Sequence, residues 1–220
     1  MNLTSGLISN YWIWISWFIY GFLTLYSIWQ APWHKLKESD SANIYYGTIV
    51  LLLILWSIKA GIYPGESFHF LGLTTACLMF NWPFALIATQ LLTLAITLNG
   101  QASWDTFALN NIIMGAISIG ITHLLRTLAQ RYLPHNFFIY IFFNVFFASA
   151  IGISLTGAAT YILLLTSGTY PIEALNQQLL PVYLLLAFPE GLLNGIVMTM
   201  LIIYKPHYVA TFYDKSYLSK

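Results

Sequence analysis

Two side chains that can hold a cation, Glu66 and His69, stand three residues apart in the stretch GIYPGESFHFLG. A carboxylate and an imidazole both offer lone pairs that a divalent transition metal ion accepts. Simpler roles are open for each. Glu66 could begin a helix, where the helix dipole favours an acid, and His69 in the first turn could be a hydrogen-bonded packing residue. These two residues are nevertheless the first candidates for a ligand site.

A further ionisable residue, Glu190, lies within an apolar segment in the run FPEGLLNG, with Asn194 one helical turn further on the same face. An acidic side chain inside a membrane span must face protein or water, which makes it a functional candidate by default. The alternative is a buried glutamate that only locks helix packing. Asn110, at the start of the run NNIIMGAISIG, is a further polar candidate for an outward-facing pocket.

Small residues recur near these polar groups, at Gly115 and Gly120 and again at Gly191 and Gly195. Gly191 and Gly195 are four apart, a spacing that lets a second helix approach closely in a membrane. They predict close helix packing. The sequence leaves open whether the neighbour is a helix of the same bundle or a partner protein.

The composition places these candidates in a membrane protein. Of 220 residues, 59% are hydrophobic and 7% are charged, against about 25% charged in an ordinary soluble domain. The net charge is +1 and no basic stripe is present, which excludes a nucleic-acid-binding surface. The only cysteine, Cys77, lies in an apolar run and indicates neither a disulfide nor a zinc site. The first residues lack the pattern of a cleaved signal peptide, so we expect the first span to be retained.

Apolar runs of about 20 residues predict membrane spans. The expected architecture is an all-α, polytopic bundle in a single domain, residues 1–220, with a cytosolic tail at 205–220. A longer run is divided by Asn81 and Pro83, which predict a turn between two short helices. The lysines and arginines of the short loops place the N-terminus outside and the C-terminus in the cytoplasm. The seven predicted spans are 11–30, 43–62, 68–81, 83–98, 107–125, 137–166 and 182–204.

Several catalytic and energy-coupling motifs are missing from the sequence. No G-x-x-x-x-G-K-[ST] phosphate loop is present, so the chain cannot drive transport with ATP by itself. Neither H-E-x-x-H nor G-x-S-x-G occurs, which removes the most recognisable hydrolase chemistries. The sequence therefore favours a binder or conduit over an enzyme.

Four blocks in order resemble the CbiM-like family, the substrate-capture membrane subunits of energy-coupling-factor ABC transporters for cobalt and nickel. They are the N-terminal MNLTSG, then SFHFLG at 67–72, ALNNIIMG at 108–115 and PEGLLNG at 189–195. Together they span nearly the whole chain. The resemblance implies seven spans with the N-terminus outside, as the loop charges also predict.

The resemblance also implies a metal site. In the family the N-terminal segment tucks into the bundle, and a planar set of nitrogens holds the ion. These nitrogens would come from the amine of Met1, from residue 2 and from the imidazole of His69. Residue 2 is histidine in the family and asparagine here, so Asn2 is a much weaker ligand. Either the site is rebuilt around His69, Glu66, Asn110 and Glu190, or the ligand is not nickel or cobalt.

The leading interpretation is a subunit of the cell (inner) membrane that captures a divalent transition-metal cation. It would have no intrinsic cofactor beyond a bound nickel or cobalt ion. A transmembrane coupling protein and cytosolic ATPases would be its partners. One alternative is an assembly or sensory module that keeps the fold without the metal site. Another is a membrane enzyme or haem protein that uses His69 or His123.

Overall fold

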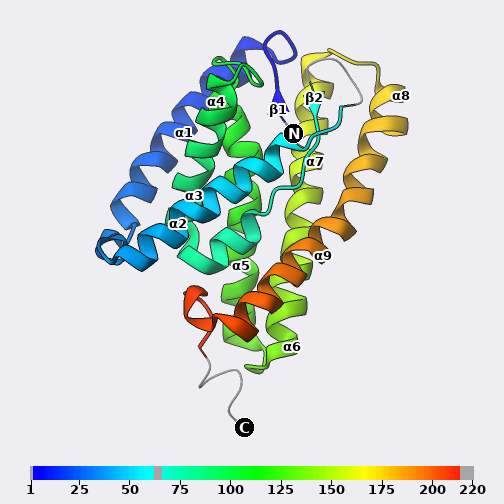
Figure 1. Ribbon diagram of the computed structural model, residues 1–220. Coiled ribbons are helices and arrows are strands. Elements are labelled where there is room, and N and C mark those ends of the chain that lie inside the picture. Colours follow the sequence, from blue (N-terminus) through cyan, green and yellow to red (C-terminus); the bar gives the residue numbers. More distant parts are fainter. Residues whose placement is uncertain (1, 62–65, 214–220) are drawn as a thin grey trace.

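The computed structural model describes residues 2–61 and 66–213 of the chain. Its architecture is all-α, a bundle of helices with one pair of two-residue strands at its upper end (Figure 1). Within the described residues, five continuous helical segments are long and apolar enough to cross a membrane. They are α1 (Asn10–Gln30), α3 (Leu73–Leu98), Phe107–Tyr132, Phe137–Ser167 and Ile172–Tyr204.

Three of these segments are assembled from α-helical pieces joined by wider, π-helical turns. The first joins α4 (Phe107–Asn110) to α5 (Ile117–Tyr132), the second α6 (Phe137–Ile139) to α7 (Ala148–Ser167), and the third α8 (Ile172–Ala174) to α9 (Leu180–Tyr204). Such turns shift the helical register and are frequent near functional sites. The first of them, Asn111–Ala116, begins directly after Asn110.

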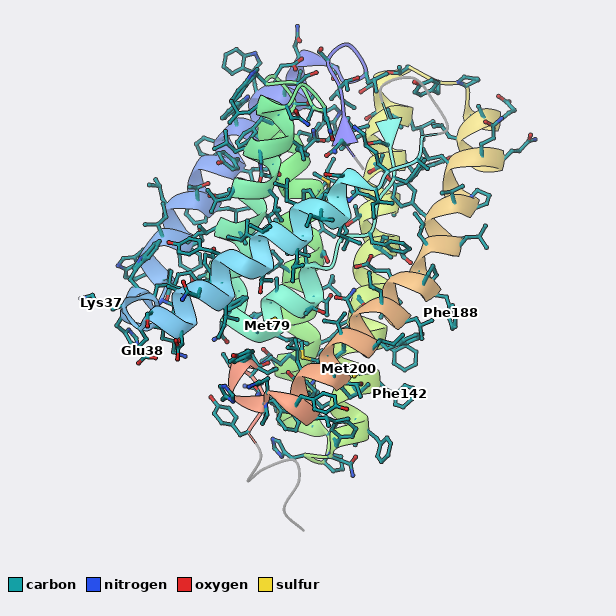
Figure 2. The ribbon with its side chains drawn as sticks, viewed as in Figure 1. Lys37, Glu38, Met79, Phe142, Phe188 and Met200 are labelled. Carbon is teal, nitrogen blue, oxygen red and sulfur yellow. The ribbon has the colours of Figure 1, made fainter. Side chains whose placement is uncertain are left out.

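The segment between α2 (Ser39–Ser57) and α4 goes down through the bundle and returns. β1 (Asn2–Leu3) pairs with β2 (Glu66–Ser67), and the carbonyl of Leu3 accepts a hydrogen bond from Thr106 Oγ1 at 2.6 Å. β2 and the start of α4 therefore lie at the same, upper end of the bundle in Figure 1. Between them, the carbonyl of Met79 accepts from the amide of Ala210 at 3.1 Å, near the lower end (Figure 2).

A sharp corner at Asn81 reverses this segment. Asn81 has φ 67° and ψ 164°, a region occupied almost only by glycine, so its backbone is strained. Pro83 follows two residues later, and the guanidinium of Arg126 donates to Asn81 Oδ1 at 3.2 Å. The interruption expected at Asn81 and Pro83 is therefore present in the structure.

The expectation that Glu66 and His69 lie in the first turn of a helix is wrong. Glu66 belongs to β2, and α3 begins only at Leu73, after Gly72 in the left-handed conformation with φ 64°. The bridge between Ala60 and Phe68 keeps the chain extended up to the site. The physical reason is pairing, because β1 and Ala60 supply the backbone partners that a helix would otherwise provide.

The total of seven spans and the sidedness of the bundle stay predictions. Besides the five apolar segments, α2 runs from the lower left of the bundle toward the N-terminal strand (Figure 1). Within α3, the corner at Asn81 separates the descending part, residues 73–80, from the part that returns. The α2 helix ends at Ser57, five residues before the end of the predicted span 43–62, and residues 62–65 lie outside the described part. The last helix begins earlier than predicted, with α8 and Leu180 ahead of residue 182.

The outer surface of the bundle is apolar, as a lipid-facing surface requires. Phe142, Phe188 and Met200 project from the side formed by α9 and the π-helical turn Tyr140–Phe147 (Figure 2). Residues after α9 fold back beneath the corner, where Thr211 Oγ1 donates to the carbonyl of Leu78 at 2.7 Å. Part of the predicted tail 205–220 therefore packs against the bundle.

Candidate binding site

The N-terminal strand is inserted into the upper end of the bundle. Asn2 is opposite Ser67 and Leu3 is opposite Glu66 in an antiparallel pair. Asn2 is 2% exposed and Leu3 is fully buried. For these residues the tucked arrangement implied by the family resemblance is therefore observed. Met1, the proposed source of the amine ligand, lies outside the described residues.

Asn110 holds this strand from the side through its amide group. Its Oδ1 accepts from the amide of Leu3 at 3.0 Å, and its Nδ2 donates to the carbonyl of Leu3 at 3.0 Å. Thr106, one turn earlier, donates to the same carbonyl. The side chain of Asn110 thus pairs with the backbone as a neighbouring strand would. In this structure Asn110 positions the N-terminal strand.

His69 occupies a buried position beside Trp56. The imidazole is 3% exposed, and the centres of the two rings are 4.7 Å apart. The indole Nε1 of Trp56 donates to the carbonyl of Leu71 at 2.9 Å, which fixes the chain just after His69. His69 Nδ1 lies 3.0 Å from the carbonyl oxygen of Phe70, and Nε2 has no hydrogen-bond partner among the described residues.

Asn2, like His69, has buried polar side-chain atoms without hydrogen-bond partners among the described residues. Both Oδ1 and Nδ2 of its buried side chain lack a partner within the described part of the chain. Alternation along the extended chain puts His69 on the same face as Ser67, which is opposite Asn2. Buried polar atoms normally find partners, so a site with an unused imidazole nitrogen and an unused amide is suited to a ligand.

Glu190 and Asn194 bind the backbone at the start of α3. Glu190, 1% exposed, accepts from the amides of Leu71 and Gly72, both at 2.9 Å, and from Asn194 Nδ2 at 2.8 Å. Asn194 Oδ1 accepts from the amide and the hydroxyl of Thr75 at 3.0 and 2.8 Å. A carboxylate at a helix N-terminus is stabilised by the helix dipole. Glu190 and Asn194 therefore hydrogen-bond to the backbone that follows His69 in the chain, from Leu71 to Thr75.

The predicted site residues divide into groups. Asn2 and His69 share one face, Asn110 holds Asn2's strand, and Glu190 with Asn194 holds the chain after His69. Glu66 is placed by its backbone in β2. Among the described residues no three histidine, cysteine, aspartate or glutamate side chains gather as a metal-binding group. A bound cation would therefore depend on His69, amide or backbone donors.

The four glycines singled out in the sequence differ in the space beside them. A Cβ on Gly115 would lie 2.7 Å from Thr89 Cγ2, and one on Gly191 would lie 2.9 Å from the ring of Phe146. These two glycines permit close contacts inside the bundle. A Cβ on Gly120 or Gly195 would meet no atom of the described residues within 4 Å.

Two residues of the site, Trp56 and Thr106, were not predicted from the sequence. Trp56 is fully buried and contacts both His69 and the carbonyl of Leu71. A tryptophan near the end of an apolar run is typical of the membrane interface, so its type and position gave no sign of this role. Thr106 lies one turn before Asn110, and that spacing on a helix face was a usable signal.

The fold and site define a multi-pass helical membrane protein whose N-terminal strand is inserted beside a buried polar site. The chain belongs to the CbiM family: the family model described as the cobalt uptake substrate-specific transmembrane region matches residues 2–208. It is thus a membrane component of metal uptake and not an enzyme.

Two solved structures have the same fold. One, described as a truncated transition metal transporter, has a TM-score of 0.75 and 15% sequence identity, and the match covers 93% of this chain and 99% of that chain. The other, described as a transition metal transporter, has a TM-score of 0.74 and 15% identity, covering 91% and 92%. A comparison with curated protein sequences gives no significant match.

Proposed function

We propose that the chain is the membrane-embedded substrate-capture subunit of an energy-coupling-factor type ABC transporter. Its cargo would be a divalent transition-metal cation, with cobalt(II) and nickel(II) as the first candidates. The observation that carries this proposal is the closed site at the N-terminal strand, where His69 Nε2 and the side-chain amide of Asn2 are buried and have no hydrogen-bond partner among the described residues. Family membership supports the cation class, since the family model is described by cobalt uptake.

The proposed orientation puts this site at the outer face of the cell membrane and residues 205–213 at the cytoplasmic face. Capture would occur when the N-terminal strand closes over the ion beside His69. Release inward requires energy that the chain cannot supply, because it has no phosphate-binding loop. A transmembrane coupling protein and a pair of cytosolic ATPases would supply it. Gly120 and Gly195, which have open space beside them, are candidates for contact with the coupling protein.

Isolation of the tagged chain from its native membranes tests the assembly. We expect it to be purified with one integral membrane protein and with ATPases that carry the phosphate loop. Proteoliposomes of that complex should accumulate radioactive cobalt or nickel only when ATP is present on the ATPase side. Accumulation that is independent of ATP, or a chain isolated without any ATPase, would contradict the assembly.

Substitution of Asn2 by histidine should strengthen binding of nickel and cobalt. An imidazole is a stronger ligand than an amide for these ions, and residue 2 faces the same side of the strand pair as His69. We expect the dissociation constant for nickel to fall by about tenfold or more in Asn2→His, measured by calorimetry in detergent. Asn99→His, at an exposed position of the same end of the bundle, is the control. Equal affinity in Asn2→His and wild type would show that residue 2 does not face the ion.

The alternative function is an assembly or sensory module that has kept the fold without metal uptake. The observation in its favour is the small number of strong donors, because Asn2 replaces the family's histidine and no group of three metal-binding side chains is found in the described residues. This alternative predicts that His69→Ala changes folding or partner binding and leaves cellular metal content unchanged.

A further inference from the structure

A single peptide group, between Phe70 and Leu71, connects the buried carboxylate of Glu190 to the ring of His69. On one edge, the amide of Leu71 donates to Glu190 Oε2 at 2.9 Å. On the other edge, the carbonyl oxygen of Phe70 lies 3.0 Å from His69 Nδ1. The carbonyl of Phe70 and the amide of Leu71 belong to the same planar unit. Two hydrogen bonds and one peptide plane therefore join an acid on α9 to the candidate ligand.

The chemistry of the partners fixes the direction of both hydrogen bonds. A carbonyl oxygen can only accept, so His69 Nδ1 must carry the proton that lies between it and Phe70. In the neutral ring the lone pair then belongs to Nε2, which is buried and has no partner in the described chain. This is the tautomer that leaves Nε2 ready to bind a metal ion.

Three hydrogen-bond donors surround the Glu190 side chain, an arrangement that stabilises its carboxylate form. The amides of Leu71 and Gly72 and Nδ2 of Asn194 all approach its two oxygens, and all three can only donate. A negative charge beside the amide of Leu71 polarises the peptide group and increases the electron density on the carbonyl of Phe70. A stronger acceptor there holds the Nδ1 proton more firmly and makes Nε2 a better donor to a metal.

Helix capping alone does not account for these contacts. Gly72 is the N-cap of α3, so Leu71 precedes the helix, and its amide is not among those that a helix N-terminus leaves unpaired. The hydrogen bond from Leu71 to Glu190 therefore restrains the extended chain that carries His69, and not the helix. Trp56 restrains the same segment through a separate hydrogen bond to the carbonyl of Leu71.

We propose that Glu190 is a positioning residue for His69, acting through the Phe70–Leu71 peptide group to fix the tautomer and orientation that present Nε2 to the cation. The part of this inference that concerns metal affinity rests on the proposed function. The part that concerns the tautomer does not depend on any metal.

Nitrogen-15 NMR of histidine-labelled protein tests the tautomer directly. The chain has five histidines, and comparison with His69→Ala identifies the signals of His69. We expect a protonated Nδ1 and an unprotonated Nε2 in the metal-free wild type. In Glu190→Gln the charge is lost and the new amide NH₂ opposes an N–H donor, so the His69 signals should move toward the other tautomer. Glu173→Gln, the same chemical change at an exposed residue, should leave them unchanged.

Titration of the same proteins with nickel and cobalt adds the functional measurement. Glu190→Gln should weaken binding by about 10- to 100-fold, the usual effect of removing a group that orients a metal-ligating histidine. Asn194→Ala, which removes one donor from Glu190 and keeps the acid, should have a smaller effect in the same direction and serves if Glu190→Gln does not fold.

Two outcomes overturn the inference. One is a wild-type His69 that is protonated at Nε2. The other is a folded Glu190→Gln protein that keeps both the wild-type tautomer of His69 and a metal affinity within about twofold of wild type. If Glu190→Gln does not fold, the same result in Asn194→Ala overturns the inference. If wild type binds neither metal, the proposed cargo is wrong while the NMR result still decides the role of Glu190.

Discussion

Replacing Gly72 by alanine should lower the free energy of unfolding by about 2–4 kcal/mol. Gly72 has φ 64°, which costs energy for any residue with a Cβ, and the added atom would lie 2.6 Å from Leu52 Cδ2 and 3.3 Å from Leu55 Cδ2. Gly72 also donates its amide to Glu190 and is the N-cap of α3. Chemical unfolding of the purified protein in detergent, followed by circular dichroism, measures the effect.

Gly47→Ala is the matched control for Gly72→Ala. Gly47 lies inside α2 in ordinary helical conformation, and a Cβ there would meet no atom within 4 Å in the part of the chain that the structure describes. Alanine should therefore leave stability unchanged or raise it by up to about 1 kcal/mol, because it is the better helix former. Equal stability of Gly72→Ala and Gly47→Ala would contradict the tight left-handed start of α3.

Asn110→Ala should detach the N-terminal strand and weaken cation binding. The substitution removes two hydrogen bonds to Leu3 and leaves its buried amide unpaired, while Thr106 still serves the carbonyl. The expected cost is about 2–3 kcal/mol, equivalent to roughly a 30- to 150-fold loss of affinity for a ligand that needs the strand in place. Metal titration gives the affinity, and hydrogen exchange at the amide of Leu3 reports detachment of the strand.

The control for this substitution is Asn99→Ala, an exposed asparagine in the turn after α3. It should bind metal and protect the amide of Leu3 as wild type does. Rapid exchange at Leu3 combined with wild-type affinity in Asn110→Ala would mean that the strand is not part of the binding site.

The sequence was sufficient to predict the helical membrane architecture, the family and the corner at Asn81. These features depend on long apolar runs, ordered motifs and a proline, all of which are local signals. The loop charges predict an orientation, which the structure alone does not test. His69 was already a candidate from its residue type and position, and the family resemblance added Asn2. Alternation along the chain from the Asn2–Ser67 pair puts both on one face.

Other features depended on contacts between distant parts of the chain. The pairing of Asn2 with Ser67 involves strands of two residues, too short for any alternation of apolar and polar side chains to show. The extended conformation at His69 follows from that pairing, which is why a helical first turn was wrongly expected. The partners of Glu190 are mainly backbone amides, and amides carry no sequence signature. The sequence could therefore single out Glu190 as an acid that is costly to bury in a membrane span. Its hydrogen-bond partners became visible only in the structure.

The central claim is that the site at His69 binds a divalent transition-metal cation. The most direct measurement is titration of wild type and His69→Ala in detergent with nickel, cobalt, zinc, copper and manganese, with metal content determined after dialysis. His135→Ala, in the loop before α6, is the control. The account predicts near-stoichiometric binding of at least one ion by wild type and His135→Ala, and its loss in folded His69→Ala. Absence of binding for all five ions, or binding that persists without His69, would contradict it.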